Sequence, residues 1–211
     1  MKNLYFIILA ALAVQGCAFN QKVAYHEFTP PSLKATGDQA IALGVQDQRP
    51  YVLSEDKTES FVGLTRGGFG NPFDVVTATG GPLADDIAIT LKKALGSRGF
   101  QVKIVGVSPN TSLDQVIESL LGAGMERSIL LRFTEWKTDT SLTSSIHYDL
   151  TMLVYDETGQ ILANNRIRGD EEIETIGSVM TYEHLKDTVP VAFNARMERL
   201  INDPKIVRAL E

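Results

Sequence analysis

Residues 145–159 read SIHYDLTMLVYDETG, and residues 160–169 continue the chain as QILANNRIRG. In the first stretch an apolar side chain stands at every second position, namely at Ile146, Tyr148, Leu150, Met152 and Val154. This strict alternation predicts a β-strand that buries one face and exposes the other, with His147 on the exposed face. The segment 156–159 is typical of a hairpin turn, so we expect residues 160–169 to return as an antiparallel strand.

The chain around this hairpin alternates short apolar stretches with helical patterns. Leucine or isoleucine recurs at every fourth position from Leu83 to Leu95, which predicts a helix that Gly99 ends. Ser112 and Gln115 form a capping-box pattern at the start of a second helix. Helices are also expected over 187–201 and 203–210, and strands over 40–45, 61–64, 74–78, 100–105 and 128–138.

These elements predict a single α+β domain over residues 39–211. Its sheet is expected to be mixed, with an antiparallel meander in the C-terminal part, and its helices to pack mainly on one face. A hydrophobic content of 44% is typical of a globular chain.

The first residues have the pattern of a secretory signal peptide. Lys2 supplies a positive charge, and residues 4–14 form an unbroken apolar run. A run of this length fits a signal-peptide core of about 7–15 residues and is shorter than the ~20 residues of a membrane-spanning helix. It leads into Val14-Gln15-Gly16-Cys17, which resembles the lipobox of bacterial lipoproteins.

Cys17 is the single cysteine of the chain, so no disulfide can form within it. An incidental free thiol is the alternative to a lipid acceptor. The resemblance to lipoproteins implies cleavage before Cys17, a thioether-linked diacylglycerol and a further acyl chain such as palmitate. Two or more acyl chains hold a protein stably on a membrane. Because Ala18 follows rather than Asp, the resemblance implies an outer-membrane lipoprotein that faces the periplasm.

We therefore divide the chain into a signal peptide (1–16), a lipidated cysteine with a flexible tether (17–38) and the domain (39–211). Prolines at 30 and 31 cannot continue a helix, and Gly37-Asp38 is a turn signal. A tether of about 20 residues reaches at most ~65–70 Å when extended. We expect the domain to stand clear of the bilayer.

Several motifs together resemble the YajG-like family of outer-membrane lipoproteins. They are the lipobox, the strand ending in Asp47-Gln48-Arg49, the helix exit Arg98-Gly99-Phe100, the strand around Tyr148 with its Gly159 turn, and a last helix with Ala192 and Asn194. The resemblance covers most of the mature chain. It implies a lipid-anchored envelope protein, but no activity, because the family has no settled one.

The sequence contains no motif for catalysis, a metal or a cofactor. His26, His147 and His184 lie far apart, and neither an H-E-x-x-H nor a C-x-x-C spacing occurs. No G-x-S-x-G string indicates a serine nucleophile. Asp85-Asp86 is better explained as a helix start, and residues 170–172 as a solvated turn, than as catalytic carboxylates. We therefore predict no catalytic residue, no metal ligand and no cofactor.

Four residues are candidates for contacting a partner. Asp47 and Arg49 follow the first strand, where a salt-bridged turn is the alternative, and Arg66 and Phe69 lie in or beside a glycine-rich loop. Phe69 is expected either as a buried plug or as an exposed anchor. Removal of residues 1–16 takes away one Lys and changes the formal charge from −6 to −7, which argues against nucleic acid as a partner.

Three functional hypotheses follow. The favoured one is a non-enzymatic envelope lipoprotein, held on the membrane by lipid, that binds a protein or peptide through a sheet edge or the 61–80 loop. The second is an accessory subunit of an envelope assembly or transport complex, and the third is a hydrolase of cell-wall or lipid substrates. The sequence does not indicate the oligomeric state.

Overall fold

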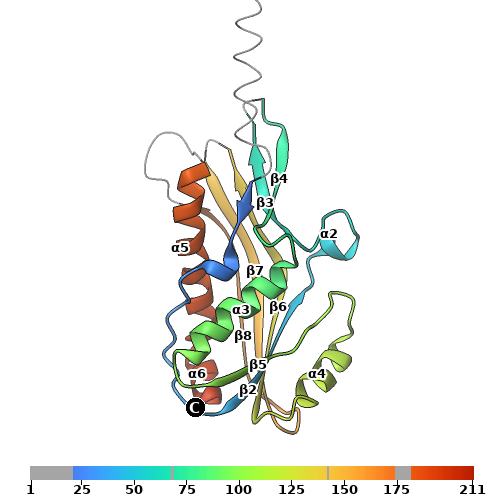
Figure 1. The fold of residues 1–211 in the computed structure, drawn as a ribbon, viewed down its shortest axis with the longest axis vertical. Coiled ribbons are helices and arrows are strands. Elements are labelled where there is room, and N and C mark those ends of the chain that lie inside the picture. The colour runs from blue at the N-terminus through green and yellow to red at the C-terminus, as the bar shows by residue number, and fades with distance from the viewer. Residues whose placement is uncertain (1–20, 68, 142, 174–181) are drawn as a thin grey trace, which may run out of the picture.

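A mixed eight-stranded sheet forms the framework of the structure (Figure 1). The structure is a computed structural model that describes residues 21–67, 69–141, 143–173 and 182–211. Of these, residues 182–186 are described by their backbone only. The strands are β1 Lys22–Val23, β2 Ala40–Asp47, β3 Phe61–Arg66, β4 Pro72–Thr77, β5 Gln101–Ile104, β6 Arg127–Thr140, β7 Ser144–Asp156 and β8 Ile161–Ile173. The helices are the 3-10 turn η1 Tyr25–Glu27, α2 Pro50–Leu53, α3 Leu83–Gly96, α4 Leu113–Leu121, α5 Tyr182–Ile201 and α6 Pro204–Leu210.

The long strand β6 holds the sheet together because it pairs along both of its edges. On one edge it runs antiparallel to β7, which pairs in turn with β8, so the predicted C-terminal meander is confirmed. On the other edge its residues 127–133 pair with β2 and its residues 138–140 pair with β3, both in parallel. β2 and β3 therefore lie end to end along one edge of β6. β5 extends the sheet beyond β2, and β4 and β1 extend it beyond β3.

Helices α3, α5 and α6 cover one face of the sheet, which confirms the α+β prediction (Figure 1). The apolar positions that recur along α3 and α5 are buried, namely Leu83, Ile87, Leu91 and Leu95 in α3 and Val189, Phe193, Met197, Leu200 and Ile201 in α5. α4 lies on the other face, where Val116 and Leu120 pack against Ala42 and Leu130. β2 is thus buried from both sides, which explains its continuous apolar sequence.

A buried arginine fills the gap between the end of β2 and the start of β3. Arg49 is fully buried, and its Nη1 donates to the carbonyl oxygens of Phe61 (2.6 Å) and Trp136 (3.2 Å). Its Nη2 donates to the carbonyl oxygen of Glu59 at 3.3 Å. The guanidinium therefore serves carbonyl groups of β3, of the loop before it and of β6, at the point where β2 has ended.

Asp47 supplies the countercharge to this arginine. Its carboxylate accepts from Arg49 Nε at 2.9 Å and from Nη2 at 2.6 Å, and it also accepts from the backbone N–H of Arg49. Burial alone lowers the pKa of Arg49, but the hydrogen bonds and charge of Asp47 raise it above its ordinary value. The rings of Tyr51 and Phe133 lie 5.4 and 5.2 Å from the guanidinium carbon and enclose it.

Residues 21–38, which we expected within a flexible tether, belong to the folded domain. Lys22 and Val23 form β1, which pairs with β4. Leu33 and Ala35 are buried. The side chains of Glu198 on α5 and of Asn202 just after α5 bind the backbone N–H groups of Ser32 and Lys34. The tether prediction is therefore wrong for these residues, because their apolar side chains pack on the helical face. Residues 17–20 lie outside the described part of the chain.

Tyr25 fastens this N-terminal segment to the core. Its side chain is fully buried, and its hydroxyl accepts a hydrogen bond from Trp136 Nε1 at 3.0 Å. Its ring contacts those of Phe28, Trp136 and Phe193 at centroid distances of 4.9, 6.3 and 5.6 Å. Burial raises the pKa of the Tyr25 hydroxyl well above its ordinary value. The segment therefore supplies a central part of the core.

Three other segments differ from the predictions. Residues 50–53 form the short helix α2, where only a turn was expected. α5 begins at Tyr182 rather than at 187. β8 continues to Ile173, so residues 170–172 lie in a strand rather than in a solvated turn, because each pairs across to β7.

We predict that Arg49→Met lowers the free energy of unfolding by about 3–5 kcal/mol, because it leaves Asp47 buried without its countercharge. The matched control is Arg166→Met, which removes the exposed pair between Arg166 and Asp149 on the sheet surface and is expected to cost at most about 1 kcal/mol. Urea denaturation at pH 7 measures both. Equal losses in the two variants would contradict the role of the buried pair.

We also predict that Tyr25→Ala lowers the free energy of unfolding by about 3–5 kcal/mol, as expected for a large aromatic residue removed from a core. Thr36→Ala changes an exposed residue of the same segment and is expected to stay within about 0.5 kcal/mol of the parent protein. Thermal or urea unfolding compares the two. If residues 21–38 were a tether, neither variant would lose stability.

Candidate functional site

The four candidate contact residues do not form one surface. Asp47 and Arg49 have exposed fractions of 1% and 0%, and their side chains bind each other and the backbone of the chain. The buried pair is therefore structural, so the salt-bridged interpretation holds and the prediction of a partner contact there is wrong. Arg66 and Phe69 lie apart from it, at the tip of the β3–β4 hairpin. Cys17 lies outside the described residues.

Arg66 is held by an ion pair at the end of β3. Its Nε and Nη2 donate to the two carboxylate oxygens of Asp139 on β6, at 2.9 and 2.6 Å. The hydrogen bond from Arg66 lowers the pKa of Asp139, against a smaller rise due to burial. This pair fastens the start of the hairpin tip to β6 and compensates the charge of Arg66.

Phe69 projects from the hairpin tip. Its side chain is 78% exposed, so of the two predicted states the exposed one is correct. The tip is closed by backbone hydrogen bonds from Gly67 N–H to the carbonyl of Asn71 (2.9 Å) and from Gly70 N–H to the carbonyl of Gly67 (2.8 Å). Gly70 has a φ of +81°, which favours glycine. An aromatic ring is thereby presented at the end of a short hairpin.

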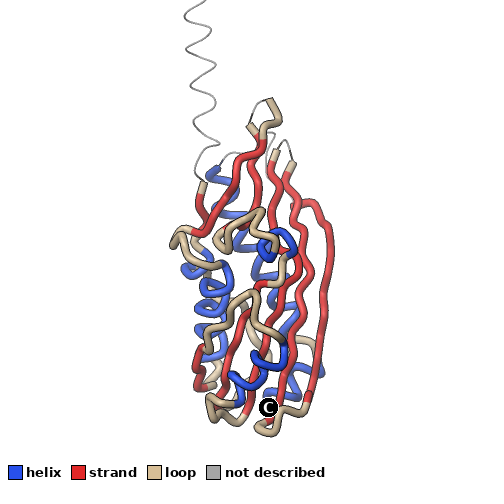
Figure 2. Tube along the Cα trace, turned by 90° about the vertical axis from the view of Figure 1, so that its right-hand side faces the viewer, coloured by secondary structure: helices blue, strands red, loops and turns tan. Residues whose placement is uncertain are grey.

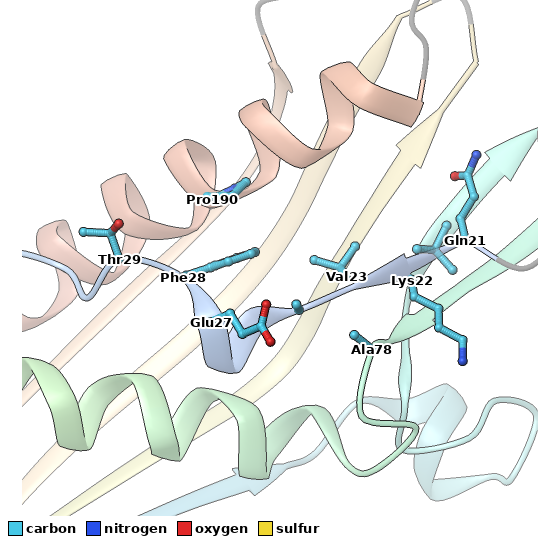
Figure 3. Close-up of a pocket in the computed structure, with 10 residues that line it drawn as sticks. Gln21, Lys22, Val23, Glu27, Phe28, Thr29, Ala78 and Pro190 are labelled. Carbon is cyan, nitrogen blue, oxygen red and sulfur yellow. The ribbon is translucent and has the colours of Figure 1, made fainter.

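An apolar groove lies below this hairpin, between the N-terminal segment and α5 (Figure 3). Its volume is about 500 Å³, and Val23 and Phe28 point from the N-terminal segment toward Pro190 on α5. Val75 and Ala78, from β4 and the residues after it, close one side, and the polar side chains of Lys22 and Glu27 also line it. Such a groove accommodates an apolar group, but it brings together no pair of groups suited to covalent chemistry.

Sequence reasoning missed this groove because its main wall was assigned to the tether. The available signal was the presence of Val23, Tyr25 and Phe28, three large apolar residues within six positions. A flexible tether has no reason to carry such residues.

The structure brings together a serine, a histidine and an aspartate on the outer face of β7 and β8. Ser145 Oγ lies 3.2 Å from His147 Nε2, and His147 Nδ1 lies 3.2 Å from Asp170 Oδ1. This order of groups is the one used to activate a serine nucleophile. The Asp170 side chain is 72% exposed, however, and a solvated carboxylate orients an imidazole only weakly. Sequence spacing did not reveal the array, because Asp170 joins it only through the pairing of β8 with β7.

The carboxylate pairs noted in the sequence occupy separate places. Asp86 at the start of α3 is buried 3.5 Å from His26 Nδ1, and burial is the main cause that raises its pKa. Glu171 on β8 accepts from the Tyr148 hydroxyl and from Arg196, and both interactions lower its pKa. Each carboxylate thus has a partner that connects two elements of the fold.

In the part of the chain that the structure describes, no three His, Cys, Asp or Glu side chains are grouped so that they could hold a metal ion. None of the helices in that part is long and apolar enough to span a membrane.

No family model matches the sequence, and no curated protein matches it either. The resemblance to the YajG-like family therefore stays a prediction. Solved structures with a similar fold include a Xanthomonas campestris protein of the DUF330 family (10% identity, TM-score 0.48, covering 85% of this chain and 95% of that one). Another is the C-terminal domain of LpoB from Salmonella enterica (15% identity, TM-score 0.33, covering 65% of this chain and 87% of that one). A third is the lipoprotein GNA1162 from Neisseria meningitidis (14% identity, TM-score 0.31, covering 76% of this chain and 99% of that one). All three TM-scores are below 0.5, so these likenesses concern the fold and indicate no function.

Proposed function

We propose that this chain is a lipid-anchored envelope protein whose domain is a non-enzymatic binding or structural module. The observation that carries the proposal is the segment Val14–Cys17, where an apolar run ends in a lipobox pattern at the single cysteine. Cleavage before Cys17 and a diacylglycerol linked to its sulfur as a thioether hold the domain on the outer membrane, on the periplasmic side. Several acyl chains make this attachment stable.

The end of the domain that carries the groove and the hairpin tip is the surface proposed for binding. The alternative surface, the free edge of β8, carries charged side chains at Arg166, Arg168 and 170–172. Charged side chains along an edge strand discourage the addition of another strand. The groove carries fewer charges, those of Lys22 and Glu27, and its mainly apolar wall is better suited to contact with a partner.

A hydrolase is the second candidate, and the array of Ser145, His147 and Asp170 is the observation in its favour. The discriminating experiment is a screen of the purified protein on cell-wall and lipid esters and amides, repeated with Ser145→Ala. Turnover that the substitution abolishes would establish the enzyme and reject the binding module. The proposal predicts no turnover in either protein.

An accessory subunit of an envelope complex is the third candidate. Light scattering of the protein without residues 1–17 distinguishes it, because a subunit that self-assembles is larger than one chain in solution. A strict monomer disfavours self-assembly.

We predict that Cys17→Ala abolishes the lipid attachment that holds the protein on the outer membrane. In cells supplied with a labelled fatty acid, the parent protein should take up label and sediment with the outer membrane. The variant should take up no label and keep its signal peptide, because cleavage at a lipobox requires the lipidated cysteine. Gly16→Ala keeps a small residue before the cysteine and serves as the matched control that still accepts lipid. A Cys17→Ala protein that still carries label would contradict the proposed anchor.

A further inference from the structure

The hairpin tip lies at the end of the molecule where the chain enters the domain (Figures 1 and 2). β1 runs parallel to β4, with Lys22 opposite Val76. The start of β1 therefore faces the same end of the sheet as the start of β4, which is the end that carries the tip. Thr65 on β3 lies opposite Thr140 on β6, so the tip continues beyond the end of β6.

The length of chain before β1 limits how far the domain can stand from the lipid. Cys17 precedes Lys22 by five positions, and Asn71 at the tip precedes Val76 by five positions as well. Five fully extended residues span at most ~18 Å, and five residues of a strand cover ~17 Å. Even when fully extended, the chain therefore cannot carry Cys17 appreciably past the level of the tip.

We propose that the β3–β4 tip rests in the membrane interface and inserts the ring of Phe69 among the lipid headgroups. This inference rests on the proposed function, since it requires lipid on Cys17. The bilayer that holds the lipid cannot lie beyond the reach of Cys17, so its surface comes to the level of the tip. The anchor and Phe69 then form two contacts with one membrane and fix the orientation of the domain.

The chemistry of the tip suits a lipid interface. Phe69 is 78% exposed, and among the described residues no atom beyond the two chain neighbours lies within 4 Å of the place that a Cβ would take at Gly70, so the tip is open on that side. Arg66 is paired with Asp139, so the tip brings no uncompensated charge to the membrane. Aromatic and aliphatic side chains of peripheral proteins bury into the boundary of headgroups and acyl chains. Because no basic cluster takes part, the contact is expected to be insensitive to salt.

The proposal replaces the expected picture of a domain that stands clear of the bilayer. The turn between β7 and β8 lies at the opposite end of the molecule, close to the C-terminus (Figure 1). That end points away from the membrane, whereas the groove opens close to the membrane surface. A partner of the groove is therefore expected to reach it along the membrane.

The test uses the full-length lipidated protein with a fluorescent NBD group attached to a cysteine at position 69 (Phe69→Cys). Because the Cys17 sulfur is blocked as a thioether, the new cysteine is the single free thiol. The protein is reconstituted into vesicles of phosphatidylethanolamine and phosphatidylglycerol, with or without lipids that carry a nitroxide quencher near the headgroup. The matched control is Glu157→Cys, an exposed position in the β7–β8 turn.

The expected result is a blue-shifted emission at position 69 and quenching several-fold stronger than at position 157, both unchanged at high salt. Equal and weak quenching at the two positions, in protein that floats with the vesicles, would overturn the proposal and leave the anchor intact. Protein that carries no lipid and does not float rejects the anchor, and the proposal with it. A probe at position 69 that is shielded in cells but exposed in the vesicles shows a protein on the tip and also overturns the proposal.

Discussion

The interaction between Arg49 and the three carbonyl groups around it is the constraint on which the rest of this fold depends. Two strands share one edge of β6 end to end, and the junction between them leaves backbone carbonyls without a strand partner. A buried carbonyl without a donor costs about 1–3 kcal/mol. The planar guanidinium has enough donors to serve all three carbonyls and still bind Asp47. Asp47 in turn compensates a charge that has no access to water.

This junction ties the part of the sheet that carries the hairpin tip to the remainder. β3 pairs with β6 through only three residue pairs, and β4 and β1 are attached through β3. The close approach depends on Gly63, since a side-chain carbon there would lie 2.3 Å from the Thr138 hydroxyl. Arg49 reinforces this short contact, so the hairpin tip, the groove and the N-terminal strand depend on it for their position.

Local sequence patterns were sufficient to predict most of the fold, but not the N-terminal segment or the site. The alternation in 145–155 and the leucine spacing of 83–95 each reflect burial within one element, and the capping box at Ser112 reflects hydrogen bonds within one helix turn. Tyr25 belongs to the core only because Trp136 and Phe193, distant in sequence, meet it. The buried role of Asp47 and Arg49 depends likewise on where β3 joins β6. Of the candidate contact residues, Arg66 and Phe69 are at the surface. The glycines around Phe69 have no side chains against which its ring could pack.

The most direct test is hydrogen exchange of Arg49→Lys, which keeps a positive charge beside Asp47 but lacks the planar set of donors. If Arg49 joins the two parts of the sheet, amides of β3 and β4 should exchange markedly faster than in the parent protein. Those of β7 and of β8 up to Arg168 should then stay close to their original rates. Uniform acceleration across all strands, or unchanged rates in β3 and β4, would contradict the account.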